Sequence, residues 1–306
     1  MEIKRVAIIG LGALGILFGQ HLRKQMQEDD LLFIVDQERK ERYEKNGFFA
    51  NGEQCQFHYV LRDERVEPVD LVIFTVKYDG LRDALEAVEN IVDDHTIFIS
   101  ALNGIVSEEV IGEQYRLENV IYAVAQGMDA VKIGNKLTYS NMGMLCFGDR
   151  EPGVISEKTK CVARFFEKTN FPHEVVTDMQ KRQWGKFMTN VGVNQTVAVY
   201  NGNYGTIQQK GEARETMIQA MREVIILSEK EGIHLTEDDL TYWLNILDEL
   251  DPEKKPSLAQ DMDAKRYSEV ELFSGTVLTL AEKYHLDTPV NRMLYDKITA
   301  IERTYE

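Results

Sequence analysis

Three glycines near the start of the chain have the spacing of a phosphate-binding turn. A short apolar run, residues 6–9, leads directly into Gly10-Leu11-Gly12-Ala13-Leu14-Gly15, and an apolar periodic segment follows. This order predicts a strand, a tight turn and a helix. Gly10 would permit the sharp turn, Gly12 would let a pyrophosphate approach the backbone, and Gly15 would let the helix pack closely on the strand. The phosphates would lie at the helix N-terminus, where free N–H groups and the helix dipole favour anions.

A carboxylate follows this motif at the distance expected of a ribose ligand. The apolar run of residues 31–35 ends at Asp36, about 20 residues beyond the last glycine. A carboxylate there accepts hydrogen bonds from the ribose 2′-hydroxyl of NAD, whereas an arginine nearby pairs with the 2′-phosphate of NADP. Arg39 and Arg42 lie just after Asp36. The sequence therefore predicts a dinucleotide site and carries signals for both forms of the cofactor.

Two further polar residues stand where buried strands end. The apolar runs 71–76 and 96–102 are typical of strands buried on both faces of a parallel sheet. Lys77 follows the first run and Asn103 the second. Ligands of such sheets bind beyond the carboxyl ends of the strands, so both residues are site candidates. The alternatives are a surface lysine and a simple Asn-Gly turn.

A set of polar side chains in the second half of the chain keeps helical register. Lys186, Asn190 and Asn194 are spaced by four residues, so on a helix they share one face; we call them the polar stripe. Their neighbours are apolar, a setting that lowers the pKa of a lysine and makes unpaired amides costly. The stripe is either a binding face, a solvated face or a satisfied buried network. Glu269, in what we expect to be a later helix, could face the same site or be an ordinary exposed acid.

The sequence predicts that these candidates lie on two kinds of structure, alternating strands and helices in the first part of the chain and helices alone in the second. Strands and helices alternate up to about residue 176, which predicts a doubly wound, parallel, Rossmann-type sheet. Segments 136–139 and 144–147 are interpreted as antiparallel strands at its edge. Beyond residue 178 the periodicity is helical, with one long helix expected to begin at Pro256-Ser257 and to include Val270 and Leu280. We therefore expect an α/β dinucleotide-binding domain at 1–176 and an all-α substrate and catalytic domain at 177–306.

Composition narrows the class of protein. The 306 residues are 43% hydrophobic and 28% charged, as in globular proteins, and the net charge of -16 argues against nucleic acid and anionic membranes as partners. The three cysteines are widely spaced, which fits reduced thiols rather than disulfides or a metal site. With no run of 18 apolar residues and no room for a signal peptide before the first strand, we expect a cytoplasmic protein.

Taken together, the motifs resemble those of the ketopantoate reductase family, within the 6-phosphogluconate-dehydrogenase-like group. The resemblance covers nearly the whole chain, and the order and spacing of its parts make it specific. These parts are the glycine motif, Thr75-Val76-Lys77, Ala101-Leu102-Asn103-Gly104, Phe147-Gly148, Trp184-Gly185-Lys186 with Asn190 and Asn194, and Ser257-Leu258-Ala259-Gln260-Asp261 followed by Glu269.

The resemblance implies a reductase of 2-oxo acids that uses a nicotinamide cofactor. Lys186 would be the general acid and Glu269 its catalytic partner. Asn190, Asn194 and Ser257 would hold the substrate, while Lys77 and Asn103 would line the nicotinamide end of the cofactor site, Asn103 also reaching the substrate. The family implies NADP(H), whereas Asp36 favours NAD(H) because it would repel a 2′-phosphate. A small oxo acid is the expected partner, and a homodimer stays open.

Two alternatives to this function stay open, one from a departure from the family pattern and one from the fold. Members commonly carry Asn-Gly where this chain has Tyr204-Gly205, with Asn201 and Asn203 nearby, so a relative that acts on another 2-oxo or 3-oxo acid is an alternative. A dinucleotide-binding sensor without turnover is the alternative of another class. If the chain is a reductase of ketopantoate or of another oxo acid, we expect the glycine turn to form one wall of a cleft and the pair Lys186 and Glu269 to form the other.

Overall fold

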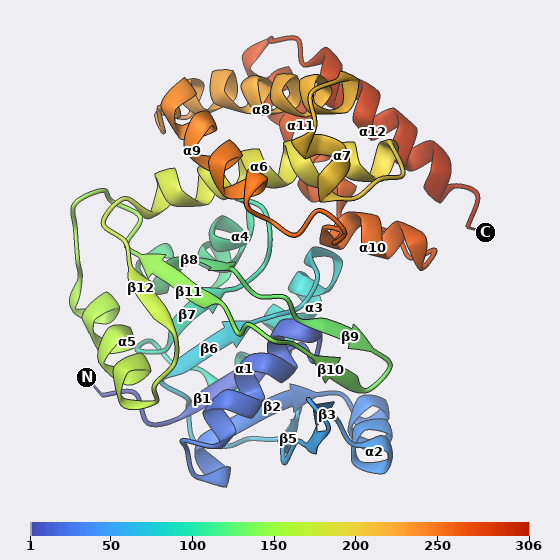
Figure 1. The fold of residues 1–306 in the computed structure, drawn as a ribbon. Coiled ribbons are helices and arrows are strands. Elements are labelled where there is room, and N and C mark those ends of the chain that lie inside the picture. The colour runs from blue at the N-terminus through green and yellow to red at the C-terminus, as the bar shows by residue number, and fades with distance from the viewer. Residues whose placement is uncertain (1, 306) are drawn as a thin grey trace. The chain divides into compact units, whose positions relative to one another are not determined.

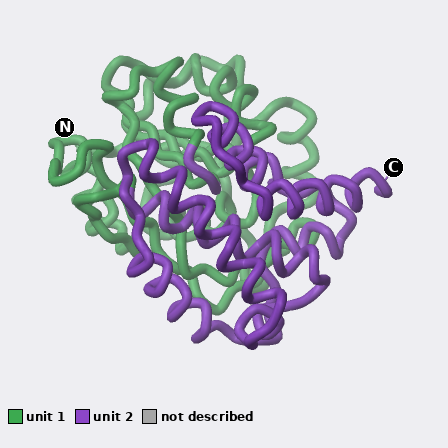
Figure 2. Tube along the Cα trace, turned by 90° about the horizontal axis from the view of Figure 1, so that it is seen from above, with its two compact units in different colours: residues 1–102, 106–180 green, residues 103–105, 181–306 purple. Residues whose placement is uncertain are grey.

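The computed structural model describes residues 2–305 (Figure 1). The chain consists of two compact units (Figure 2). The first contains Met1–Leu102 and Val106–Gln180, and the second contains Asn103–Ile105 and Lys181–Glu306. The short segment after the strand at 97–100 thus belongs with the second unit. Within the described residues, no helix combines the length and the apolar character needed to cross a membrane.

The first unit is built on an eight-stranded sheet whose strand order is β12-β11-β8-β7-β6-β1-β2-β5. Its pairs are parallel from β5 to β8, β11 runs antiparallel to β8, and β12 is parallel to β11. The alternation of buried strands with helices therefore produces the predicted doubly wound fold. The strands are β1 (Val6–Ile9), β2 (Leu31–Val35), β5 (His58–Leu61), β6 (Leu71–Phe74), β7 (Ile97–Ser100), β8 (Val120–Gln126), β11 (Met144–Gly148) and β12 (His173–Val175).

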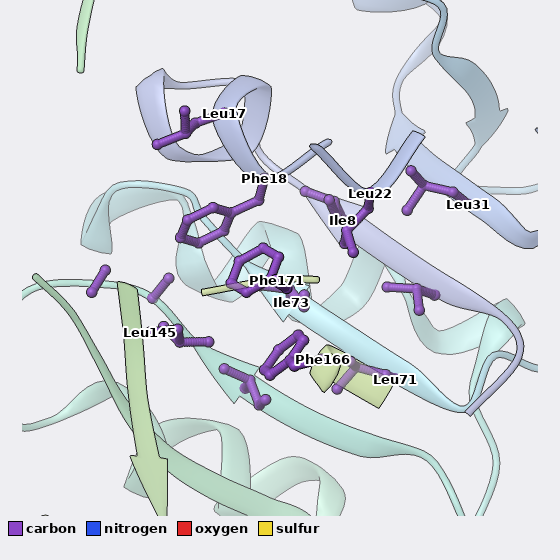
Figure 3. Close-up of a cluster of buried hydrophobic side chains, with 14 of the residues drawn as sticks. Ile8, Leu17, Phe18, Leu22, Leu31, Leu71, Ile73, Leu145, Phe166 and Phe171 are labelled. Atoms are coloured by element: carbon purple, nitrogen blue, oxygen red, sulfur yellow. The ribbon is translucent and has the colours of Figure 1, made fainter. Parts of the chain in front are cut away.

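Both faces of this sheet are buried, which explains why its central strands are continuously apolar. Along β1, Val6 and Ile8 belong to one hydrophobic cluster, whereas Ala7 and Ile9 belong to another. The first cluster includes side chains of α1 (Ala13–Arg23) and α5 (Glu157–Lys168), and Figure 3 shows part of it. The second includes side chains of α3 (Leu81–Ala87) and α4 (Ser107–Tyr115).

One expectation about the sheet edge is wrong. Segment 136–139 does not extend the main sheet: β10 (Lys136–Thr138) lies in a separate four-stranded sheet of order β4-β3-β10-β9. It pairs antiparallel with β9 (Val131–Ile133) and parallel with β3 (Phe49–Ala50), which in turn pairs with β4 (Glu53–Gln54). The partner β3 is distant in sequence, so the local pattern at 136–139 did not contain this pairing.

The second unit is helical, as predicted (Figure 1). Its longest helix, α6, begins in the first unit and carries the polar stripe. The α-helices are α6 (Met179–Val199), α7 (Tyr204–Gln208), α8 (Glu212–Lys230), α9 (Glu237–Asp248), α10 (Ser257–Asp263), α11 (Ser274–Tyr284) and α12 (Pro289–Glu302), with the short 3-10 helix η5 at Val270–Leu272.

The single long helix expected from Pro256 onward is instead three elements, α10, η5 and α11. Lys265 has a φ of 51°, in the left-handed region that ends helices, and the Arg266 N–H donates to the Asp261 carbonyl in the closing turn. The apolar residues do pack inward, but from separate segments. Consequently Glu269 lies at the N-cap of η5 and not inside a helix.

Candidate functional site

The glycine motif has the predicted geometry, and its three glycines are required for different reasons. Gly10 has a φ of 100°, and a Cβ there would lie 2.7 Å from the Val76 nitrogen. A Cβ on Gly15 would overlap the Gly10 carbonyl oxygen. Gly12 is exposed, and a Cβ there would have only the Thr75 carbonyl oxygen nearby, at an ordinary 3.7 Å. The protein itself thus requires glycine at 10 and 15 but leaves space at 12.

That space fits a phosphate ligand. Gly12 is the N-cap of α1, and within the described residues no side chain caps this helix and no acidic residue occupies its first turn. The helix N-terminus therefore presents its N–H groups and positive dipole end beside an uncrowded glycine, which is the arrangement that binds a pyrophosphate. Thr75 stabilises the turn because its hydroxyl contacts the carbonyl oxygens of Ile9 and Gly10 at 3.1 and 2.6 Å.

Asp36 and Arg39, the two opposed signals for cofactor choice, are bonded to each other. Asp36 is the N-cap of α2 (Gln37–Asn46), and its Oδ1 accepts a hydrogen bond from the Arg39 backbone N–H at 2.7 Å. Its Oδ2 pairs with the Arg39 guanidinium at 3.0 Å. Arg42 pairs instead with Glu38. The carboxylate thus has a structural role in starting α2, and a cationic group stands beside it at the end of β2.

The residues that follow β6 and β7 belong to different units. Lys77 is the N-cap of the 3-10 helix η2 (Tyr78–Gly80) in the first unit, and its carbonyl accepts a hydrogen bond from the Gly80 N–H at 3.0 Å. Asn103 belongs to the second unit. Both stand at the carboxyl end of a parallel strand, where the sequence predicts ligand-binding residues.

Within the second unit, Asn103 joins the two residues to which the resemblance assigns catalysis. Its Nδ2 donates a hydrogen bond to Glu269 Oε2 at 2.9 Å, and its Oδ1 accepts one from Lys186 Nζ at 3.4 Å. The three side chains are half-buried. These contacts span 166 and 83 residues of sequence, so the local sequence gave no signal for them. The arrangement places an ammonium and a carboxylate on either side of one amide.

Glycine contacts position the neighbouring backbone. Gly104, with a φ of 89°, packs on Leu272 of η5, where an added Cβ would lie 3.4 Å from Leu272 Cδ2. On α6, a Cβ at Gly185 would overlap the indole of Trp243, and one at Gly192 would lie 3.0 Å from the Met217 carbonyl oxygen. Helix α6 therefore packs closely against α9 and α8, which fixes the helix that carries the polar stripe.

The rest of the polar stripe lies further along α6. Asn190 is half-buried, and Asn194 is only 5% exposed. In the part of the chain that the structure describes, neither side-chain amide has a hydrogen-bond partner. Neither amide is among the fully buried unpartnered groups, so both keep donors and acceptors that a ligand could bond.

Ser257 and Tyr204 are connected through one loop. Ser257 is exposed at the first position of α10. The loop before it is held by backbone bonds from Tyr204 N–H to the Lys254 carbonyl at 3.0 Å and from Gly205 N–H to the Pro252 carbonyl at 2.9 Å. Burial raises the pKa of the half-buried Tyr204 phenol. Asn203, in contrast, is used as the N-cap of α7 in a capping box with Thr206.

Comparison with known proteins identifies relatives along nearly the whole chain. The family described as "Ketopantoate reductase PanE/ApbA" matches residues 6–151, and "Ketopantoate reductase PanE/ApbA C terminal" matches residues 178–302. A 2-dehydropantoate 2-reductase of Archaeoglobus fulgidus is 25% identical over 303 residues, which are 99% of each chain.

Solved structures share the fold. D-mandelate dehydrogenase, in its ternary structure with NADH and anilino(oxo)acetate, has a TM-score of 0.85 and 20% identity over 98% of this chain and 99% of that one. The dimeric ketopantoate reductase of Staphylococcus aureus has a TM-score of 0.80 and 20% identity over 99% of this chain and 100% of that one. At these identities the likeness supports the fold alone.

Proposed function

The chain belongs to the ketopantoate reductase family, and on that premise we propose that it reduces the ketone of a small 2-oxo acid with a nicotinamide dinucleotide, ketopantoate first among the candidates. Its relatives over the full length are 2-dehydropantoate 2-reductases, NAD(P)H-dependent oxidoreductases. The observation that carries the proposal is the bonded set of Lys186, Asn103 and Glu269 within the second unit.

Lys186 is proposed as the general acid. When bound, the cofactor would supply a hydride to the ketone carbon, and the carbonyl oxygen would gain negative charge. The Lys186 ammonium would stabilise this charge and then donate a proton to the oxygen, so that one hydride and one proton complete the alcohol. Its hydrogen bond to Asn103 Oδ1 holds Nζ in one direction before the substrate arrives.

Glu269 and the amides are proposed to position the substrate. Asn103 Nδ2 occupies one Glu269 oxygen, which fixes the carboxylate so that its remaining acceptor positions can bind the substrate hydroxyl. The unpartnered amides of Asn190 and Asn194, with Ser257 at the start of α10, would hold the rest of the substrate. Such prior positioning lowers the entropic cost of reaching the reactive geometry.

The cofactor site is proposed to use the glycine motif and the strand ends of the first unit. The N-terminus of α1 and Gly12 would bind the pyrophosphate, with Leu11, Ala13 and Leu14 as backbone neighbours. Asp36 would bind the ribose hydroxyl of NAD, while Arg39 could bind a 2′-phosphate. Because the two side chains already form an ion pair, the site supports the use of either cofactor, with NADH favoured by the carboxylate.

Steady-state kinetics test the proposal. The purified protein is mixed with ketopantoate and either NADPH or NADH, and oxidation of the nicotinamide is followed. Turnover with either cofactor is expected. Absence of turnover with NADPH and also with NADH would overturn ketopantoate as the substrate.

A second candidate is a related reductase of another 2-oxo or 3-oxo acid, favoured by Tyr204 at the position of the family asparagine. A panel of oxo acids separates the two, because the true substrate should have the highest kcat/KM. Cofactor binding without turnover of any oxo acid would instead favour a sensor.

A further inference from the structure

A buried hydrogen-bond network joins four helices of the second unit. Gln195 on α6, Ser274 at the start of α11 and Asn291 near the start of α12 are each 0% exposed. Gln195 Oε1 accepts from the Ser274 backbone N–H at 3.3 Å, and its Nε2 donates to the Val191 carbonyl at 2.7 Å. The Ser274 hydroxyl donates to Asn291 Oδ1 at 3.0 Å, which Gln195 Nε2 also approaches at 3.5 Å.

The network ends on a carboxylate of α8. Glu223, 8% exposed, accepts hydrogen bonds at 2.9 Å from the backbone N–H groups of Val290 and Asn291, which lie in the first turn of α12. The Asn291 side chain donates to the same carboxylate at 2.8 Å and to the Ala220 carbonyl at 3.1 Å. A carboxylate at a helix N-terminus neutralises its free donors and dipole. The network therefore connects α6, α8, α11 and α12 through fully bonded groups.

Gln195 lies on the opposite face of α6 from Lys186. The two are separated by nine positions, which at about 100° per residue corresponds to about half a turn. Gln195 thus faces the interior of the helical unit, while the polar stripe faces elsewhere. Gln195 is 0% exposed and its polar atoms bond protein groups, so we expect any effect on the reaction to act through other residues.

Ser274 is coupled to Glu269 by a short stiff connector. The Leu272 N–H donates to the Glu269 carbonyl at 3.0 Å, and the Phe273 N–H donates to the Val270 carbonyl at 3.1 Å. Leu272 and Phe273 are 3% and 0% exposed. Because this connector is short, hydrogen-bonded and packed, we expect a displacement of Ser274 to displace Glu269 as well.

We propose that Gln195, Ser274 and Asn291 are positioning residues that hold Glu269 at hydrogen-bond distance from Asn103, in register with Lys186 on α6. The inference rests on the proposed function, because it assigns these residues to the same site. Apolar side chains could fill the same space, but directional hydrogen bonds select one arrangement of the helices.

Two substitutions test the network, with one matched control. Gln195→Met keeps a similar volume but removes the acceptor of the Ser274 N–H, and Ser274→Ala removes the bond to Asn291. Ser228→Ala is the control, because Ser228 is also 0% exposed in the second unit and bonds the Ile225 carbonyl and the Leu235 N–H at 2.7 and 3.1 Å. Its bonds lie within α8 and the loop after it, apart from the candidate site residues.

Three measurements are made on each variant: Tm, steady-state kinetics with ketopantoate, and hydrogen–deuterium exchange of segment 269–274. Gln195→Met and Ser274→Ala should lower kcat by between about 10-fold and 100-fold, because small displacements of catalytic groups have effects of this size. The KM for the cofactor should stay unchanged, and segment 269–274 should exchange faster. Ser228→Ala should lower Tm but change neither kcat nor exchange in this segment.

The proposal is overturned if the network variants lower Tm as the control does and leave both kcat and exchange at 269–274 unchanged. If Gln195→Met does not fold, Ser274→Ala still tests the proposal, since it removes only one side-chain hydrogen bond. If the unsubstituted protein reduces no oxo acid, the proposed function fails, and the exchange of segment 269–274 alone decides whether the network positions Glu269.

Discussion

The two units carry their candidate residues in different ways. In the first unit the central feature is backbone: a turn of three glycines and a helix N-terminus, all within residues 10–15. In the second unit it is a set of side chains, Asn103, Lys186 and Glu269, joined over 83 and 166 residues. A backbone site is encoded locally, because spacing and glycine content define it. A side-chain site depends on packing and therefore on distant parts of the chain.

The largest effect is expected at Lys186 in the side-chain site. Lys186→Ala should lower kcat with the oxo acid by on the order of 10² or more, because the general acid is removed, while cofactor affinity is retained. Lys181→Ala is the matched control, since Lys181 is on the same helix but pairs with Asp239 at 3.1 Å. Equal kcat values for the two variants would contradict the role of Lys186 as the general acid.

The second-largest effect is expected at the glycine turn, where two substitutions distinguish contact with the ligand from packing within the protein. Gly12→Ala should weaken cofactor binding by about tenfold or more, equivalent to at least about 1.4 kcal/mol. It should leave Tm nearly unchanged, because the added Cβ would meet the protein only at an ordinary 3.7 Å from the Thr75 carbonyl oxygen. Gly15→Ala should lower the stability of the first unit by about 3 kcal/mol, because its Cβ overlaps the Gly10 carbonyl.

Cofactor titration and thiol labelling distinguish these variants. All three cysteines, Cys55, Cys146 and Cys161, are buried in the first unit, so their labelling reports its unfolding. Burial raises the pKa of the Cys55 thiol to about 11, which slows its reaction further. Native affinity in Gly12→Ala would contradict the assignment of the pyrophosphate to this turn.

A smaller change should follow from the charge at Asp36. Asp36→Asn keeps an N-cap for α2 but removes the charge that repels a 2′-phosphate, so the ratio of kcat/KM for NADPH to that for NADH should rise about tenfold, or about 1.4 kcal/mol. Arg39→Ala should shift the ratio in the opposite direction. An unchanged ratio in both variants would show that the Asp36 and Arg39 pair does not select the cofactor.

The smallest effect is expected from an ion pair in the helical unit. Burial of Glu231 would raise its pKa, but hydrogen bonds from Lys283 and Tyr284, both at 2.7 Å, outweigh this and lower it below the ordinary 4.5. The bonded carboxylate therefore stabilises the folded state above about pH 4.5, and this contribution is lost as the pH falls through the lowered pKa. Glu231→Gln should cost less than about 1 kcal/mol at pH 7.

Tryptophan fluorescence measures this effect, because Trp184 and Trp243 both lie in the second unit. Melts of Glu231→Gln and the unsubstituted protein should differ at pH 7 and converge at low pH. Labelling of the cysteines in the first unit should not distinguish the two proteins. A difference that grows at low pH would contradict the lowered pKa of Glu231.

Prediction from sequence failed at two places, one because of a local turn and one because of a distant partner. Residues 256–280 have helical spacing throughout, yet the left-handed turn at Lys265 divides them, and Glu269 became an N-cap. Segment 136–139 has the residues of a strand, but its parallel partner is β3. Periodicity gives the type of an element and the face that it buries, but not where a neighbouring segment interrupts it.

The sequence alone determined the glycine turn, the buried parallel strands and the helical second half, because each depends on residues that lie close together in the sequence. The tertiary structure decided that Asn103 joins Glu269 to Lys186, and that Gln195, Ser274 and Asn291 connect the helices behind them. These bonds form only when packing has brought distant segments within about 3 Å, a condition that no local pattern of residues contains.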